Sequence, residues 1–117
     1  MPTRQLKSQA DLDFSLSESG VMGYTVVYIY DDSSPTHSQL KPAFELISRE
    51  CPFSHFFTIS YEDCEGEGIL EKYNINTFPY FLVFKGQNLI AQFESETANN
   101  LSKQLRKLNV APPLQTE

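Results

Sequence analysis

An unbroken apolar run between residues 24 and 30 limits the folds open to this chain more than any other feature. The run, YTVVYIY, is almost entirely β-branched or aromatic and carries no charge. A strand that faces water on one side alternates polar and apolar residues, so this run predicts a strand buried on both faces. We therefore expect a sheet covered by helices, in one domain, because 117 residues are too few for two cores.

The rest of the chain alternates between strand-like and helix-like segments. Further strands are predicted at Arg4–Ser8 and Phe56–Tyr61, and a hairpin at residues 77–93 with a tight turn at Lys85–Asn88. Helices are predicted at Ala10–Glu18, at Pro35–Glu50, around Ile69, Leu70 and Tyr73, and around Leu101, Leu105 and Leu108. The predicted order is βαβαβαββα, an α/β sandwich over residues 1–110, followed by a tail at residues 111–117.

Charge and hydropathy exclude two classes of partner. The net charge of −6 argues against non-specific binding to nucleic acids or anionic membranes. The longest apolar stretches, such as Phe78–Phe84, are too short to cross a bilayer, and residues 1–8 lack the apolar segment of a signal peptide. We expect a cytoplasmic protein whose partners are other proteins.

Three stretches resemble the thioredoxin-like superfamily, at the mutual spacing found in that family. The stretch YNINTFPYFLVFKG resembles the segment that carries a cis-proline, with Pro79 in that place. Residues 32–42, which end in SPTHSQLKP, lie where a thioredoxin has its Cys-x-x-Cys motif, and SYEDCEGEG resembles the loop after the third strand. The resemblance covers nearly the whole chain. It implies a three-layer sandwich with a mixed central sheet and a cis bond between Phe78 and Pro79.

The resemblance also shows that the motif has lost its thiols. Ser34 falls at the nucleophilic cysteine and His37 at the resolving cysteine, so Ser34, Pro35, Thr36 and His37 form a vestigial motif. Tyr28 takes the place of the buried aspartate that assists proton transfer in thioredoxins. Dithiol exchange needs a thiolate and a second thiol. We therefore expect no catalytic residue in the motif, no dithiol oxidoreductase activity and no cofactor.

The motif residues also have a purely structural interpretation. Ser34 is a suitable N-cap, Pro35 suits the first position of a helix, and the two preceding aspartates favour the positive end of the helix dipole. A serine nucleophile would need an adjacent base that a third group orients. A metal site would need more than His37 and His55. We predict capping, with neither serine catalysis nor a metal site.

Two cysteines remain outside the motif. Cys51, in the stretch CPFS, resembles a monothiol glutaredoxin motif, but it closes a predicted helix, whereas the active motif opens one. Cys64 is predicted near the start of the third helix, where the helix dipole lowers a thiol pKa and four neighbouring acids raise it. Cys64 is the candidate reactive thiol of an alternative function, a lone-thiol redox enzyme or sensor. A strand of about six residues separates the two cysteines by about 20 Å, so no disulfide is expected.

Two further stretches resemble the thioredoxin domain of phosducin-like proteins, which bind G-protein βγ subunits or assist chaperonin folding. They are VVYIYDD, with the turn that follows it as far as His37, and LVFKGQNLIAQF. In thioredoxins the residue before the cis-proline offers its backbone to an extended peptide beside the motif turn. The resemblance implies a binding or scaffold module, acting as a chaperone or signalling cofactor. Its protein or peptide partner would lie against Ser33, Ser34, Thr36, Thr77, Phe78 and Pro79. Tyr80 stands where thioredoxins usually carry a small threonine, which leaves open whether its ring fills this site.

Overall fold

The structure is a computed structural model that describes residues 3–18 and 23–110. In chain order its elements are β1 (Thr3–Gln5), α1 (Gln9–Glu18), β2 (Tyr24–Tyr30), α2 (His37–Glu50), β3 (His55–Ser60), α3 (Tyr61–Cys64), α4 (Ile69–Lys72), β4 (Tyr80–Lys85), β5 (Asn88–Glu94) and α5 (Ala98–Lys107). The tail predicted at residues 111–117 lies outside the described residues. None of the helices in the described ranges is long and apolar enough to span a membrane.

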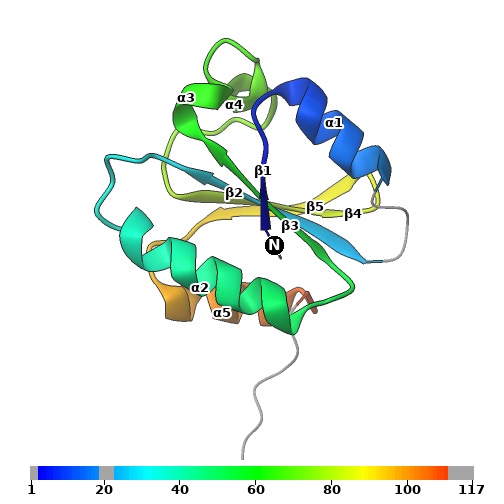
Figure 1. Cartoon of the computed structure of the whole chain (residues 1–117), viewed down its shortest axis with the longest axis vertical. Helices are drawn as coiled ribbons and strands as arrows, with labels where there is room; N and C mark the ends of the chain where they lie inside the picture. The colour runs from blue at the N-terminus through cyan, green and yellow to red at the C-terminus, as the bar shows by residue number, and fades with distance from the viewer. Residues whose placement is uncertain (1–2, 19–22, 111–117) are drawn as a thin grey trace, which may run out of the picture.

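The five strands form one mixed sheet in the order β1-β3-β2-β4-β5. Strands β1 and β2 run parallel to β3, whereas β4 runs antiparallel to both of its neighbours. Figure 1 shows the sheet between two layers of helices, with α1, α3 and α4 on one face and α2 and α5 on the other. This arrangement confirms the predicted three-layer sandwich with a thioredoxin-like order of elements.

The sheet divides the core into two clusters. The α1–α4 cluster consists of Leu6, Leu12, Leu16, Val27, Ile29, Phe57, Ile59, Cys64, Ile69, Tyr73, Ile75, Leu82 and Phe84. The α2–α5 cluster consists of Val26, Tyr28, Leu40, Phe44, Ile47, Cys51, Phe56, Phe81, Val83, Leu101, Leu105 and Val110. Successive side chains of β2 alternate between the two clusters, which is why the whole YTVVYIY run is apolar. The predicted burial of this strand on both faces is confirmed.

Both edges of the sheet are interrupted. β1 is only three residues long. In β5 the pairing shifts between Leu89, opposite Phe84, and Ala91, opposite Val83, so Ile90 is an extra residue in a β-bulge. The first strand is shorter than the predicted Arg4–Ser8 because the Ser8 hydroxyl caps α1, accepting the backbone N–H of Asp11 at 3.1 Å.

The second helix begins later than predicted. Its first residue is His37, not Pro35, and its N-cap is Thr36, whose side chain makes no capping bond. The expectation that Ser34 caps this helix is wrong. The Ser34 hydroxyl lies 2.8 Å from the Thr36 hydroxyl, so it bonds within the turn instead of to a helical N–H group.

The predicted third helix is two short helices. Gly66 and Gly68 lie between α3 and α4 with φ angles of 77° and 79°, a region that residues with a side chain rarely adopt. The two glycines interrupt the predicted helix. Cys64 is therefore the last residue of a four-residue helix and does not lie near the start of a longer one. Tyr61, predicted as the end of a strand, begins α3, because Ser60 caps it by accepting the N–H of Asp63.

Candidate functional site

The ends of β2 and β4 bring the two halves of the predicted site to one edge of the sheet. In this antiparallel pair Ile29 lies opposite Tyr80. The turn that follows Tyr30 therefore lies at the same edge as Pro79, which precedes β4. The Phe78–Pro79 peptide bond is cis, as predicted. The motif turn provides Ser33, Ser34 and Thr36, and the loop before β4 provides Thr77, Phe78 and Pro79.

The motif turn is closed by its own hydrogen bonds. The Asp31 carboxylate accepts the hydroxyl of Ser33 at 2.8 Å and its backbone N–H at 3.0 Å, and these bonds lower the pKa of Asp31. The backbone N–H of Ser34 donates to the carbonyl of Asp31 at 2.9 Å. With its hydroxyl bonded to Thr36, Ser34 lacks the imidazole contact that a serine nucleophile needs. These hydrogen bonds fix the conformation of the turn.

The centre of the site is a hydrogen bond between Tyr28 and His37. The Tyr28 hydroxyl lies 2.8 Å from His37 Nδ1, and the Tyr28 side chain is fully buried. Burial raises the pKa of Tyr28 far above its ordinary value, and the neighbouring Tyr30 hydroxyl and Asp32 carboxylate add to this effect. The hydroxyl therefore stays protonated and donates to Nδ1 of a neutral imidazole.

His37 is held in place from three sides. Its ring stacks on Tyr30, with centroids 4.3 Å apart and planes 9° from parallel, and its Nε2 lies 3.9 Å from Asp32 Oδ1. Burial lowers the pKa of His37; the nearby Asp32 carboxylate opposes this shift, and Lys41 adds to it. The neutral ring is thus the form that fits the Tyr28 hydroxyl.

Tyr28 belongs to an aromatic layer that it forms with Phe44 and Phe81. The Tyr28 ring stacks on Phe81, with centroids 4.9 Å apart and planes 8° from parallel, and a second contact joins it to Phe44 at 5.4 Å. All three rings belong to the α2–α5 cluster. The site is therefore continuous with the hydrophobic core, so its geometry is fixed by core packing.

The resemblance to thioredoxins predicts that Tyr28 takes the place of the buried aspartate and His37 that of the resolving cysteine. In the structure these two side chains form a hydrogen bond with each other. The sequence alone does not predict a contact between them. It places Tyr28 in a buried strand and His37 near the start of the following helix, but whether the two side chains meet depends on where α2 begins.

We expect a double-mutant cycle to reveal strong coupling between Tyr28 and His37. His37→Phe keeps a ring on Tyr30 but leaves the buried Tyr28 hydroxyl without its partner, which should cost about 1–3 kcal/mol of unfolding free energy. Tyr28→Phe alone should cost about 0.5–1.5 kcal/mol. The double variant should be more stable than the sum of the two losses predicts, by about 0.5–3 kcal/mol in urea denaturation. Strict additivity would show that the bond contributes nothing.

The same cycle should depend on pH. Because the folded pKa of His37 lies below its ordinary value, the stability provided by the neutral ring is complete above about pH 6.5. That stability is lost as the pH falls through the lower folded pKa. The stability difference between wild type and His37→Phe should therefore narrow in acid, and His55, present in both proteins, serves as the internal control.

Both cysteines are free thiols, and both are buried. Cys51, the residue that follows α2, packs in the α2–α5 cluster, while Cys64 packs in the α1–α4 cluster on the other face. Burial raises the pKa of Cys64 to about 12, with Asp63 and Glu67 adding to the shift, and burial also raises the pKa of Cys51. The sheet thus separates the two thiols, in agreement with the expectation that no disulfide joins them, and neither lies in an environment that forms a thiolate.

The loop before β4 presents a mixed surface. Thr77 is exposed, Phe78 is partly buried against Tyr61 with ring centroids 4.9 Å apart, and Pro79 is buried. Tyr80 packs against the α1–α4 cluster, and its hydroxyl accepts a hydrogen bond from Gln92 at 2.9 Å. That contact holds the Tyr80 ring on the face of the sheet that carries α1 and α4. Among residues 3–18 and 23–110, no three histidine, cysteine or acidic side chains gather in a metal-binding group.

Solved structures of thioredoxins have the same fold as this chain. A Plasmodium falciparum thioredoxin superimposes with a TM-score of 0.78 at 19% identity, over 89% of this chain and 97% of that one. A Fasciola hepatica thioredoxin gives a TM-score of 0.79 at 20% identity, with the same coverage of each chain. These likenesses show that the chain has the thioredoxin fold.

Sequence comparison adds one curated relative. The chain is 26% identical over 105 residues to monothiol glutaredoxin-S17 of Arabidopsis thaliana, which covers 90% of this chain. The chain spans only 20% of the length of that relative. No family model matches the chain.

Proposed function

We propose that the chain is a redox-inactive thioredoxin-like module that binds an extended segment of a partner protein. The observation that carries this proposal is the hydrogen bond between Tyr28 and His37. It joins the two positions at which a thioredoxin would keep its proton acceptor and resolving thiol. A site in which these two side chains bond to each other offers neither a free proton acceptor nor a thiol for dithiol exchange. The fold would then serve to bind a partner.

Binding is the remaining function of this edge of the sheet. In the thioredoxin arrangement a peptide lies extended between the motif turn and the cis-proline loop, and main-chain hydrogen bonds supply affinity. Here the turn is pre-formed by the Asp31 and Ser34 hydrogen bonds, so little conformational entropy is lost on binding. The exposed side chains of Ser33 and Thr77 lie on the two segments that would flank the peptide.

The resemblance to phosducin-like proteins supports a role as a chaperone or signalling cofactor in the cytoplasm. Two buried free thiols suit a reducing compartment. The curated relative, a monothiol glutaredoxin, favours the alternative of lone-thiol chemistry through Cys64. The burial of that thiol and its raised pKa argue against this alternative.

Wild-type protein should not accelerate the reduction of insulin by dithiothreitol. Its two thiols should also react slowly with a thiol reagent near neutral pH and become fully reactive only on unfolding, because both are buried. Stopped-flow titration with a chromogenic disulfide measures these rates. A single fast thiol that disappears in Cys64→Ser, and persists in Cys51→Ser, would support the lone-thiol alternative and contradict our proposal.

A substitution at Thr77 tests whether partners bind at this edge of the sheet. Thr77→Arg places a bulky charge on the exposed loop beside Phe78, and should remove partners that wild-type protein retains from a native lysate. Lys103→Glu, at an exposed position of α5, is the control and should retain them. Mass spectrometry identifies the retained proteins. Equal capture by the two variants would show that the partners bind elsewhere.

A further inference from the structure

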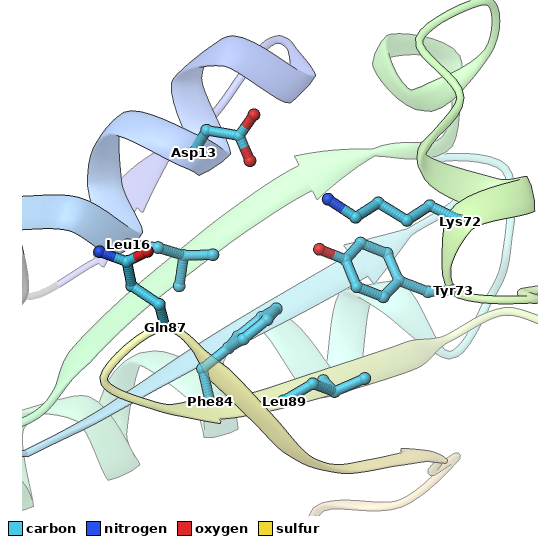
Figure 2. Close-up of a pocket in the computed structure, with 7 residues that line it drawn as sticks. All are labelled: Asp13, Leu16, Lys72, Tyr73, Phe84, Gln87 and Leu89. Atoms are coloured by element: carbon cyan, nitrogen blue, oxygen red, sulfur yellow. The ribbon is translucent and has the colours of Figure 1, made fainter.

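A second site candidate lies at the opposite end of β4 from Pro79. A cavity of ≈ 380 Å³ opens between α1, α4 and the β4–β5 hairpin, and it is lined by Asp13, Leu16, Lys72, Tyr73, Phe84, Gln87 and Leu89. Figure 2 shows that these side chains come from three separate parts of the chain. The volume lies within the range of small-molecule sites.

The cavity has an apolar floor and charged walls. Leu16, Phe84 and Leu89 form the floor, and Leu89 remains 37% exposed there. In Figure 2 the carboxylate of Asp13 and the ammonium of Lys72 turn toward each other from opposite sides, and the Tyr73 hydroxyl points in beside Lys72.

The two charges are available to a ligand. Within the described part of the chain, no ion pair joins Asp13 to Lys72. Asp13 accepts a hydrogen bond from the Gln9 side chain at 2.9 Å, which fixes one carboxylate oxygen. Lys72 Nζ lies 5.4 Å from the centroid of the Tyr73 ring, a contact that keeps the ammonium over the cavity.

From this arrangement we infer that the cavity binds a small zwitterion with an apolar body, of which an apolar α-amino acid is the simplest member. The ligand ammonium pairs with Asp13, and its carboxylate pairs with Lys72 beside the Tyr73 hydroxyl. The apolar side chain lies on Leu16, Phe84 and Leu89. A ligand with one charge would leave the opposite wall unpaired, so the site selects for both charges. This inference does not depend on the proposed function of the Ser34–Pro79 edge.

The test is a titration of the purified protein with L-phenylalanine, followed by NMR of its leucine methyl groups. The signals of Leu16 and Leu89 should shift, with a Kd of about 1 mM, a value typical of a small, weakly bound ligand. L-Phenylalanine amide, which lacks the carboxylate, and N-acetyl-L-phenylalanine, which lacks the ammonium, should each bind about tenfold more weakly or less.

Variants separate this site from general charge effects. Asp13→Asn and Lys72→Met should each weaken L-phenylalanine binding about tenfold or more. Glu71→Gln and Lys103→Met remove the same charges from exposed positions outside the cavity and should leave binding unchanged. The inference is overturned if no signal shifts at about 10 mM ligand, where a 1 mM site would be mostly filled. Equal binding of the singly charged analogues, or stability loss in the cavity variants without a change in binding, would also overturn it.

Discussion

The double variant Ser34→Cys/His37→Cys is expected to form a reversible disulfide and to gain insulin-reducing activity that the wild type lacks. The backbone N–H of His37 donates to the carbonyl of Ser34 at 3.1 Å, so the two residues are the ends of a tight turn. Turns of this kind bring the end Cα atoms within about 7 Å, the distance that a disulfide also requires. The nearby start of α2 lowers the pKa of a thiol at its N-terminus.

The gained activity should remain low. Tyr28 does not replace the buried aspartate as a proton acceptor, because its pKa is raised far above neutrality. A positioned acid–base group contributes about 10²–10⁴-fold, so the variant should be slower than a thioredoxin by about that factor. Asp31 and Asp32 also oppose a thiolate in the turn.

Controls for this experiment come from the same positions. Ser34→Cys alone provides the attacking thiol without the resolving one, and should be inactive in turnover. In the double variant the buried Tyr28 hydroxyl has lost its hydrogen-bond partner, His37. Adding Tyr28→Phe removes this hydroxyl, and should restore stability without removing the disulfide. If the folded double variant does not oxidise at all, these positions are not the vestigial motif.

The largest loss of stability is expected for Phe81→Ala. Phe81 is fully buried, stacks on Tyr28 at 4.9 Å and also contacts Phe93 at 5.5 Å. Removing the ring leaves a cavity beneath the site, which should cost about 3–5 kcal/mol in urea unfolding. Domains of this size have stabilities of about 5–15 kcal/mol, so a large part of the total would be lost.

A matched control shows whether burial is the cause. Phe53→Ala removes the same ring from a side chain that is 87% exposed, and should change stability by no more than about 0.5 kcal/mol. Phe81→Leu keeps most of the volume of the Phe81 side chain, so its loss of stability should lie between the losses of Phe81→Ala and Phe53→Ala. A loss below about 1 kcal/mol for Phe81→Ala would show that the aromatic layer does not support the site.

The sequence predicts those parts of the fold that follow from local patterns. The buried run at β2 and the turn between β4 and β5 are encoded by side-chain type alone, and the structure confirms both. The start of α2 is not encoded in that way. Ser34, a good N-cap by residue type, bonds to Thr36 instead, and such a choice between near-equal hydrogen bonds depends on the folded turn.

The adjacency of the motif turn and the loop before β4 was predictable from the sequence, and the side-chain contacts near them were not. Aligning the motif places Ser34 and Pro79 at one edge of the sheet, and the register of β2 and β4 agrees. The bond between Tyr28 and His37 needs three-dimensional information, because it joins a strand to a helix start that was expected two residues earlier. The cavity between Asp13 and Lys72 is beyond local patterns altogether, since these residues are far apart in the sequence.

The interrupted sheet edges restrict how this protein meets other chains. An added strand needs a long, flat row of free backbone groups, which a three-residue β1 and a bulged β5 do not provide. Under the proposed function, an extended partner would therefore bind at the loop before β4 and not as an added strand at a sheet edge. The same short and bulged edges would also limit edge-to-edge pairing between copies of the protein at high concentration.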